Sequence, residues 1–191
     1  MKTLYLNIIL FITFTGMLSC KAQQNSLPLN TWMENIPSGG YVKDLDNELS
    51  PYVGIYKAVY QGNEIVLFVT KEENRSTKRG GKQFYRDALV IKYIAKNQNN
   101  QVLQDTQNVN NPNLYIYSYK TQATKNRIIF VYSGTNCGVG WGDIYLKKIN
   151  NTQISWTYQA DSTVTTDQNC PGNPDLTVYL PETENLIFTK Q

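Results

Sequence analysis

Residues 53–69, VGIYKAVYQGNEIVLFV, decide the fold class of this chain. Side chains alternate in character over 53–60, a short polar link follows at Gln61-Gly62-Asn63, and the alternation resumes at Ile65. A repeat of two residues is typical of a β-strand, whereas a helix repeats about every 3.6 residues. The glycine in the link can adopt the positive φ of a tight turn. The stretch therefore predicts a β-hairpin.

The same pattern continues through the rest of the chain. After a basic loop we expect a long strand from Phe84 to about Ala95 and a short edge strand around Val102-Leu103, followed by strands over 114–119, 127–133, 143–149, 153–160, 176–180 and 186–189. Turns rich in glycine, asparagine and proline separate them. Short strands joined in this way are typical of an antiparallel meander, which closes into a barrel or folds into two packed layers. We therefore expect one all-β domain of about ten strands over residues 41–191.

Two segments near the start of this domain resemble known families. Residues 41–49, YVKDLDNEL, and 51–57, PYVGIYK, together with Ser19-Cys20-Lys21-Ala22-Gln23, resemble a family of small exported flavobacterial lipoproteins that is catalogued as a domain of unknown function. This resemblance implies an exported all-β domain and no known activity. Gly54-Ile55-Tyr56 also resembles the G-x-W opening strand of lipocalins and related calycin barrels, with tyrosine in place of tryptophan. This second resemblance favours a lipocalin-like barrel over a two-layer sandwich.

The first twenty residues have the layout of a cleaved export signal. Lys2 supplies a positive charge, and residues 6–18 supply an apolar segment that is too short for a transmembrane helix. Ser19 then places a small side chain directly before Cys20. The chain is therefore expected to leave the cytoplasm.

Met17-Leu18-Ser19-Cys20 resembles the lipobox of bacterial lipoproteins, whose cysteine is acylated and becomes the mature N-terminus. We therefore expect a signal peptide over 1–19, lipidation of Cys20, and a polar tether over 20–40. The lipid would hold the protein on a membrane of the cell envelope, and we expect the periplasm-facing side of the outer membrane. Cleavage after Ala22 is the alternative, and it would release a soluble protein.

Acylation of Cys20 would leave Cys137 and Cys170 as an even pair in an oxidising compartment. We expect these two residues to form a disulfide, with free buried thiols as the alternative. The disulfide would close the loop between Cys137 and Cys170. Closing this loop constrains the unfolded chain, which would stabilise the fold by about 3–4 kcal/mol.

The composition excludes several kinds of chemistry. Histidine is absent from all 191 residues, so Ser-His-Asp and Cys-His catalysis and histidine metal sites are excluded. The glycine-rich segments 80–81 and 134–142 match no phosphate-binding fingerprint. We expect a non-enzymatic protein with no metal, no cofactor and no nucleic-acid partner. A hydrolase that uses two of Asp87, Asp105 and Asp143 is the alternative.

Aromatic residues are the best candidates for binding. Tyr115, Tyr117 and Tyr119 alternate along one expected strand, so their rings share one face. Exposed rings could stack on a glycan or meet an envelope protein, whereas inward rings would fill the core or line a cavity for a small apolar ligand. Trp141 lies in the loop that follows Cys137, and loops on a rigid β scaffold commonly carry function. An enclosed apolar cavity larger than about 300 Å³ would indicate a lipocalin-like carrier.

A basic cluster surrounds Gly80-Gly81 and consists of Arg75, Lys78, Arg79, Lys82 and Arg86. Such a cluster can bind phosphate or an anionic lipid. Because charged hairpin tips are commonly solvated, we expect these side chains to face water.

Overall fold

The computed structural model describes residues 26–108, 114 and 116–191. Cys20 and Tyr115 lie outside this part of the chain. The strands are β1 Ser26–Pro28, β2 Tyr41–Lys43, β3 Gly54–Tyr60, β4 Asn63–Arg79, β5 Lys82–Lys96, β6 Val102–Asp105, β7 Ile116–Gln122, β8 Arg127–Tyr132, β9 Gly142–Lys148, β10 Gln153–Ala160 and β11 Leu186–Lys190. Four 3₁₀-helices connect some of these strands: η2 Met33–Asn35, η3 Ser50–Tyr52, η5 Ala123–Lys125 and η6 Asn136–Gly138. Within the described residues no helix is long and apolar enough to cross a membrane.

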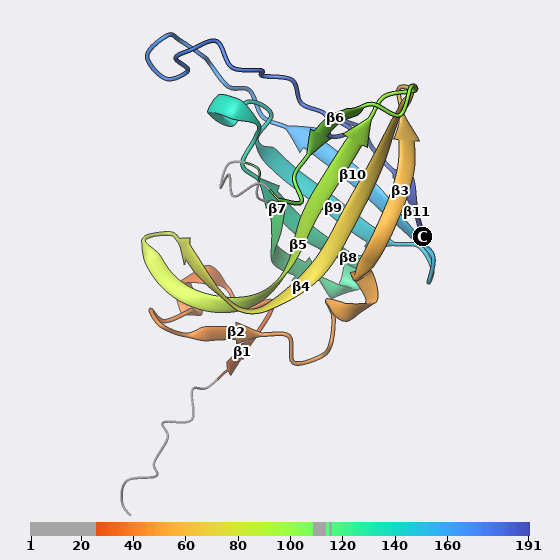
Figure 1. Ribbon diagram of the computed structural model, residues 1–191. Helices are drawn as coiled ribbons and strands as arrows, with labels where there is room; N and C mark the ends of the chain where they lie inside the picture. Colours follow the sequence, from red (N-terminus) through yellow and green to blue (C-terminus); the bar gives the residue numbers. More distant parts are fainter. Residues whose placement is uncertain (1–25, 109–113, 115) are drawn as a thin grey trace, which may run out of the picture.

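Eight of the strands form a closed antiparallel barrel (Figure 1). Each strand is hydrogen-bonded to the next in the order β5-β4-β3-β11-β10-β9-β8-β7. The ring closes because β7 also pairs with β5, where Val90 lies opposite Tyr117 and Ile91 lies opposite Ile116. The all-β barrel expected from the sequence is therefore confirmed.

Large side chains fill the interior of the barrel. Alternate residues of each strand point inward, and the bulkiest fully buried ones come from strands all round the ring: Tyr56, Tyr93, Phe130, Tyr132, Trp156, Tyr158 and Phe188. The ring centroid of Trp156 lies 5.7 Å from that of Phe188 and 6.4 Å from that of Tyr158. In the described residues these rings occupy the space where a lipocalin-like carrier would hold its ligand.

The β4–β5 hairpin extends well beyond the barrel and curves beneath it (Figure 1). Strand β4 runs to Arg79 and β5 begins at Lys82, so Gly80-Gly81 alone form the turn. The prediction of a basic loop before Phe84 is therefore wrong. This stretch forms paired strands because another part of the chain covers its inner face, where Phe84 is fully buried.

The covering segment is residues 26–43. Strand β1 pairs in parallel with β2, and β2 pairs in parallel with β5, where Tyr41 lies opposite Tyr85. Leu29 and Ile36 are both buried against the hairpin. Residues 26–40 therefore belong to the folded domain rather than to the expected tether, because their apolar side chains extend the core beneath the barrel.

The segment between β10 and β11 lies at the opposite end of the molecule (Figure 1). Cys170 in this segment forms the expected disulfide with Cys137, and their Cα atoms are 5.4 Å apart. The strand expected over 176–180 is absent from this described segment. The prediction fails because β10 pairs directly with both β9 and β11, so the sheet has no free edge there.

Candidate functional site

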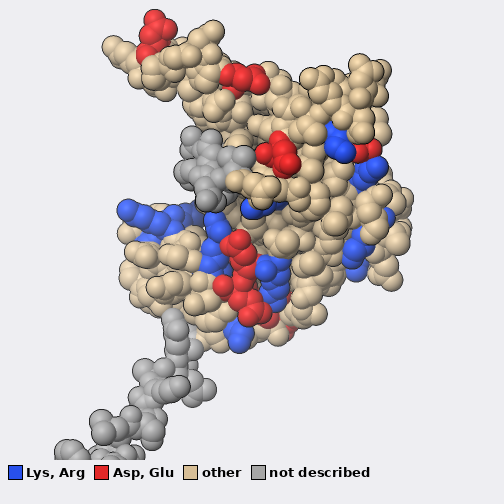
Figure 2. Space-filling model, viewed as in Figure 1, with Lys and Arg blue, Asp and Glu red and all other residues tan. Residues whose placement is uncertain are grey.

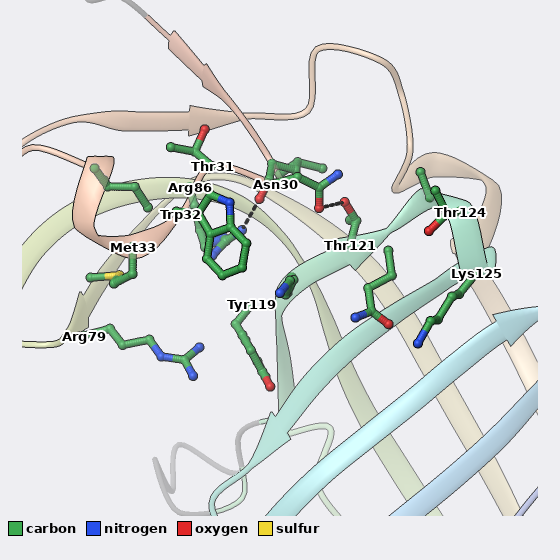
Figure 3. A pocket seen from close by; sticks show the side chains of 15 residues that line it. Asn30, Thr31, Trp32, Met33, Arg79, Arg86, Tyr119, Thr121, Thr124 and Lys125 are labelled. Carbon is green, nitrogen blue, oxygen red and sulfur yellow. Dashed lines mark hydrogen bonds between the residues drawn. The ribbon is translucent and has the colours of Figure 1, made fainter.

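A groove of about 490 Å³ lies beneath the barrel, where three parts of the chain meet. The segment 29–36 forms one wall, the end of β7 and helix η5 form the other over 119–125, and the β4–β5 hairpin contributes Arg79 and Arg86. Figure 3 shows Trp32 and Met33 on one side of the groove and Tyr119 and Thr121 on the other. Residues distant in the sequence thus converge on one surface hollow.

Arg86 is the buried cation of this groove. Only 5% of its surface is exposed, and its Nη2 donates a hydrogen bond of 3.3 Å to the carbonyl oxygen of Leu29. The buried Nε has no hydrogen-bond partner among the described residues. The ion pairs found in this part of the chain involve Lys57, Lys71 and Arg75, so none of them neutralises Arg86.

The surroundings of Arg86 disfavour its positive charge. Burial and, to a lesser extent, the positive charge of Arg79 lower the pKa of the guanidinium from its ordinary value to about 10. Asp87 and Tyr117 favour the charged form, but by less than burial disfavours it. The group stays protonated at neutral pH, so the groove contains a desolvated positive charge that forms no ion pair with a carboxylate of the described residues.

Further cations lie at the edges of the groove. The guanidinium carbon of Arg79 lies 4.0 Å from the ring centroid of Tyr119. Lys120 Nζ lies 4.9 Å from the ring centroid of Trp32. Such contacts between a cation and an aromatic face are attractive by about 0.5–1 kcal/mol at exposed sites. They hold two flexible basic side chains beside the opening.

Hydrogen bonds fix the wall formed by 29–36. Lys82 Nζ donates to the carbonyl oxygens of Met33, Glu34 and Ile36 at 3.3, 2.9 and 3.0 Å. The Thr121 hydroxyl donates to Asn30 Oδ1 at 2.8 Å, which joins this wall to β7. The wall over 29–36 is therefore attached to the hairpin and to β7 by contacts additional to the one that Arg86 makes with Leu29.

A bulge in β4 sets the direction of the hairpin just above the groove. The pairing with β5 shifts register between Glu72 and Arg75. Asp87 stabilises this shift because its carboxylate accepts hydrogen bonds from the Tyr41 hydroxyl (2.5 Å) and from the backbone N–H groups of Asp44 and Asn74 (both 3.0 Å). Burial alone would raise the pKa of Asp87, but these hydrogen bonds lower it more, and the net pKa lies below its ordinary value.

The structure separates the aromatic residues that the sequence singled out. Tyr119 lines the groove, whereas the Tyr117 ring lies beneath the Arg75 guanidinium, 5.1 Å from centroid to carbon. Trp141 belongs to the disulfide-linked loop at the other end, where 46% of its surface is exposed and its indole N–H donates to the Ser162 carbonyl at 3.4 Å. Of these candidates, Tyr119 alone among the described residues lies at the groove.

The three candidate carboxylates, those of Asp87, Asp105 and Asp143, lie on different strands. Each accepts hydrogen bonds from neighbouring groups. Asp143 accepts a hydrogen bond from the Tyr119 hydroxyl at 3.2 Å, and Asp105 accepts one from the backbone N–H of Gln107 at 2.8 Å. Strands β8 and β7 lie between the strand of Asp143 and the strand of Asp87.

The sequence pattern did not indicate most of the residues that line the groove, among them Arg86 and Trp32. Arg86 was placed in a solvated cluster, and this prediction was wrong because residues 26–43 cover the hairpin. Its spacing from Phe84 and Ala88, both fully buried, was the available signal, since alternate residues of a strand share a face. Trp32 was assigned to a tether, and no pattern in its neighbours indicated a site.

Comparison with known proteins identifies a family. The model of a family of unknown function, DUF6705, matches residues 1–191. No curated protein and no solved structure matches the chain.

Proposed function

The chain belongs to the family of unknown function DUF6705, and we propose that it is a binding domain that takes an anionic small molecule into the groove beneath its barrel. The observation that carries this proposal is the buried guanidinium of Arg86, whose Nε has no partner within the described residues. Natural proteins rarely bury a charge unless another group pairs with it. An anion in the groove would supply that partner.

The charge of the ligand follows from the energy of burial. A buried charged group left without a partner costs several kcal/mol, and hydrogen bonds to a charged group contribute about 1.5–3 kcal/mol each. A carboxylate or phosphate can accept two parallel hydrogen bonds from one guanidinium. Binding of such a group at Arg86 therefore recovers part of the free energy that its burial costs.

The remainder of the ligand is expected to be apolar or aromatic. Trp32 is 65% exposed although it is one of the largest apolar side chains of the domain, and it stands at the groove beside Met33 (Figure 3). A planar or aliphatic group packed on the indole would remove this surface from water. The proposed ligand thus combines an acidic head with an apolar body.

The cellular setting is proposed from the sequence. The lipobox-like segment ending at Cys20 supports a lipid-anchored protein of the cell envelope, with a periplasm-facing anchor. The absence of histidine from the chain supports a binding role without catalysis. In this setting the domain would bind its ligand at the membrane surface, without a cofactor or nucleic acid.

Isothermal titration calorimetry with phenyl phosphate tests the proposal, with benzyl alcohol as a neutral aromatic probe. We expect the unmodified protein to bind phenyl phosphate and not benzyl alcohol. Arg86→Met should weaken binding about tenfold to hundredfold, because it removes one charged hydrogen-bonding group. Arg127→Met is the matched control: Arg127 lies over Tyr145 and donates a hydrogen bond to Gln122 at the groove, but Arg127 does not itself line the groove. Equal affinity in the Arg86→Met and Arg127→Met variants would refute the proposal.

A further inference from the structure

The groove lies close, along the chain, to the residue expected to carry the lipid. Strand β1 begins at Ser26, six positions after Cys20, and the groove wall begins at Leu29. Six fully extended residues span about 20 Å. A domain anchored at Cys20 can therefore hold this groove within about 20–30 Å of the membrane surface, a distance similar to the size of the domain itself.

The two ends of the molecule differ in charge. Figure 2 shows Lys and Arg side chains gathered at the tip of the β4–β5 hairpin, with an acidic group beside them further from the tip, whereas the segment that carries Cys170 at the far end shows acidic side chains without basic ones. The groove lies beside this hairpin, from which Arg79 and Arg86 reach it. Anionic lipids attract basic groups near their surface by about 1 kcal/mol each. The end nearer the anchor is thus the one that an anionic membrane would attract.

The edge of the groove has the composition of a membrane-interface surface. Trp32 is mostly exposed, and Lys120 lies against its ring. Tryptophan is enriched where apolar tails meet polar headgroups, and lysine can extend its ammonium group to the headgroups while its stem contacts apolar atoms. The partly buried Met33 extends the apolar surface beside Trp32. Arg86 of the hairpin lies deeper in the groove and Arg79 lies at its edge. A guanidinium group can bind two phosphate oxygens at once.

We propose that the groove binds the phosphate-bearing headgroup of an anionic lipid in the membrane to which the chain is tethered. Arg86 and Arg79 would contact the phosphate, and Trp32 and Met33 would contact the apolar part of the lipid at the interface. This inference rests on the proposed function, because it names the class of anion that the same groove takes. The short tether raises the effective concentration of headgroups at the groove, so a weak intrinsic affinity suffices for occupancy.

The test uses the full chain with Cys20→Ser, which removes the acylated residue, so that any attachment to vesicles depends on the domain. Sedimentation with vesicles of phosphatidylcholine alone is compared with sedimentation with vesicles of equimolar phosphatidylcholine and phosphatidylglycerol. We expect binding to the anionic vesicles at least about tenfold tighter than to the neutral ones. Adding Arg86→Met to the Cys20→Ser chain should weaken binding to the anionic vesicles about tenfold. Adding Arg127→Met should change this binding by no more than about twofold.

Tryptophan fluorescence distinguishes binding of a lipid in the groove from electrostatic attraction between the protein surface and the vesicle. We expect the emission to shift to shorter wavelength on anionic vesicles, and the shift to disappear in Trp32→Phe. Vesicle binding that Arg86→Met and Arg127→Met weaken equally would show surface attraction only, and would overturn the inference. Glycerol 3-phosphate, a soluble phosphate with the same headgroup chemistry, is the competitor; if it binds as tightly as the vesicles, a free phosphate compound is the ligand and the lipid inference fails.

The two proposals can fail separately. If phenyl phosphate binds through Arg86 and the anionic vesicles do not bind, the anion site stands and its lipid ligand is refuted. If neither probe binds in an Arg86-dependent way, both proposals are refuted.

Discussion

Replacing Arg86 with methionine should make the ligand-free protein more stable, although Arg86 is one of its most deeply buried residues. The pKa of this guanidinium is about 10 in the fold, between two and three pH units below that of a free arginine. Each pH unit corresponds to about 1.36 kcal/mol, so holding the charge inside the fold costs about 3 kcal/mol. Because the pKa is lowered, the cost is fully present below pH 10 and disappears as the pH rises toward the ordinary pKa of arginine.

Methionine retains most of the aliphatic length of arginine and carries no charge. The substitution removes the hydrogen bond from Nη2 to the Leu29 carbonyl, which contributes about 1.5–3 kcal/mol because its donor is charged. The difference leaves a net gain of up to about 1.5 kcal/mol in the free energy of unfolding, since buried charges replaced by apolar side chains of similar volume are often stabilising. For a domain of this size the melting temperature should rise by up to about 6 °C.

Thermal denaturation followed by circular dichroism at pH 7, without ligand, measures this change. Arg127→Met serves as the control, because Arg127 is only partly buried and the loss of its contacts with Tyr145 and Gln122 should lower the free energy of unfolding by about 1 kcal/mol. Adding phenyl phosphate should then raise the melting temperature of the unmodified protein and not that of the Arg86→Met variant. A melting temperature lowered by Arg86→Met would refute the reasoning, because it would show that the guanidinium already has a compensating partner in the fold.

Three further predictions concern stability. Asp87→Asn should lower the free energy of unfolding by about 2–3 kcal/mol at pH 7, because an amide cannot accept hydrogen bonds from all three donors that surround this carboxylate. Urea titrations of both proteins measure this change, and an unchanged denaturation midpoint would contradict the prediction. Since the pKa of Asp87 is lowered in the fold, the unmodified protein should lose this stability as the pH falls below about 4, while the variant loses less over the same range. Cys137→Ala combined with Cys170→Ala should cost about 3–4 kcal/mol, and adding a reductant to the unmodified protein should reproduce the loss. Trp156→Ala should cost about 3–5 kcal/mol, because the ring is fully buried against Phe188, and a loss below 1 kcal/mol would show that the interior is less closely packed than described.

The barrel could be predicted from the sequence because its strands follow a simple physical rule. In β3 and the first half of β4, one face contacts the core and the other contacts water, so apolar side chains recur at every second residue. The hairpin over 53–69 was expected for this reason, and the structure confirms it. The pairing of β5 with β7, which closes the ring, joins distant segments and leaves no local pattern.

The groove could not be predicted because its parts acquire their environment only on folding. The second half of β4 carries charges on both faces, so nothing in 71–79 indicates a buried side. Arg86 becomes buried because Leu29 and its neighbours, more than fifty positions earlier, cover the hairpin. Its role therefore depends on a contact that the residues around it do not reveal.

The parallel pairing of β2 with β5 also bears on the order in which the protein would fold after the proposed export. Tyr41 would leave the membrane early, yet Tyr85, its partner in the sheet, is 44 positions further along the chain. Contacts between distant segments form late, because the loop between them must close first. The wall over 29–36 can therefore dock only when the β4–β5 hairpin has emerged and folded. A newly exported chain would have no affinity for its ligand until that moment, so occupancy of the groove would report that folding at the membrane is complete.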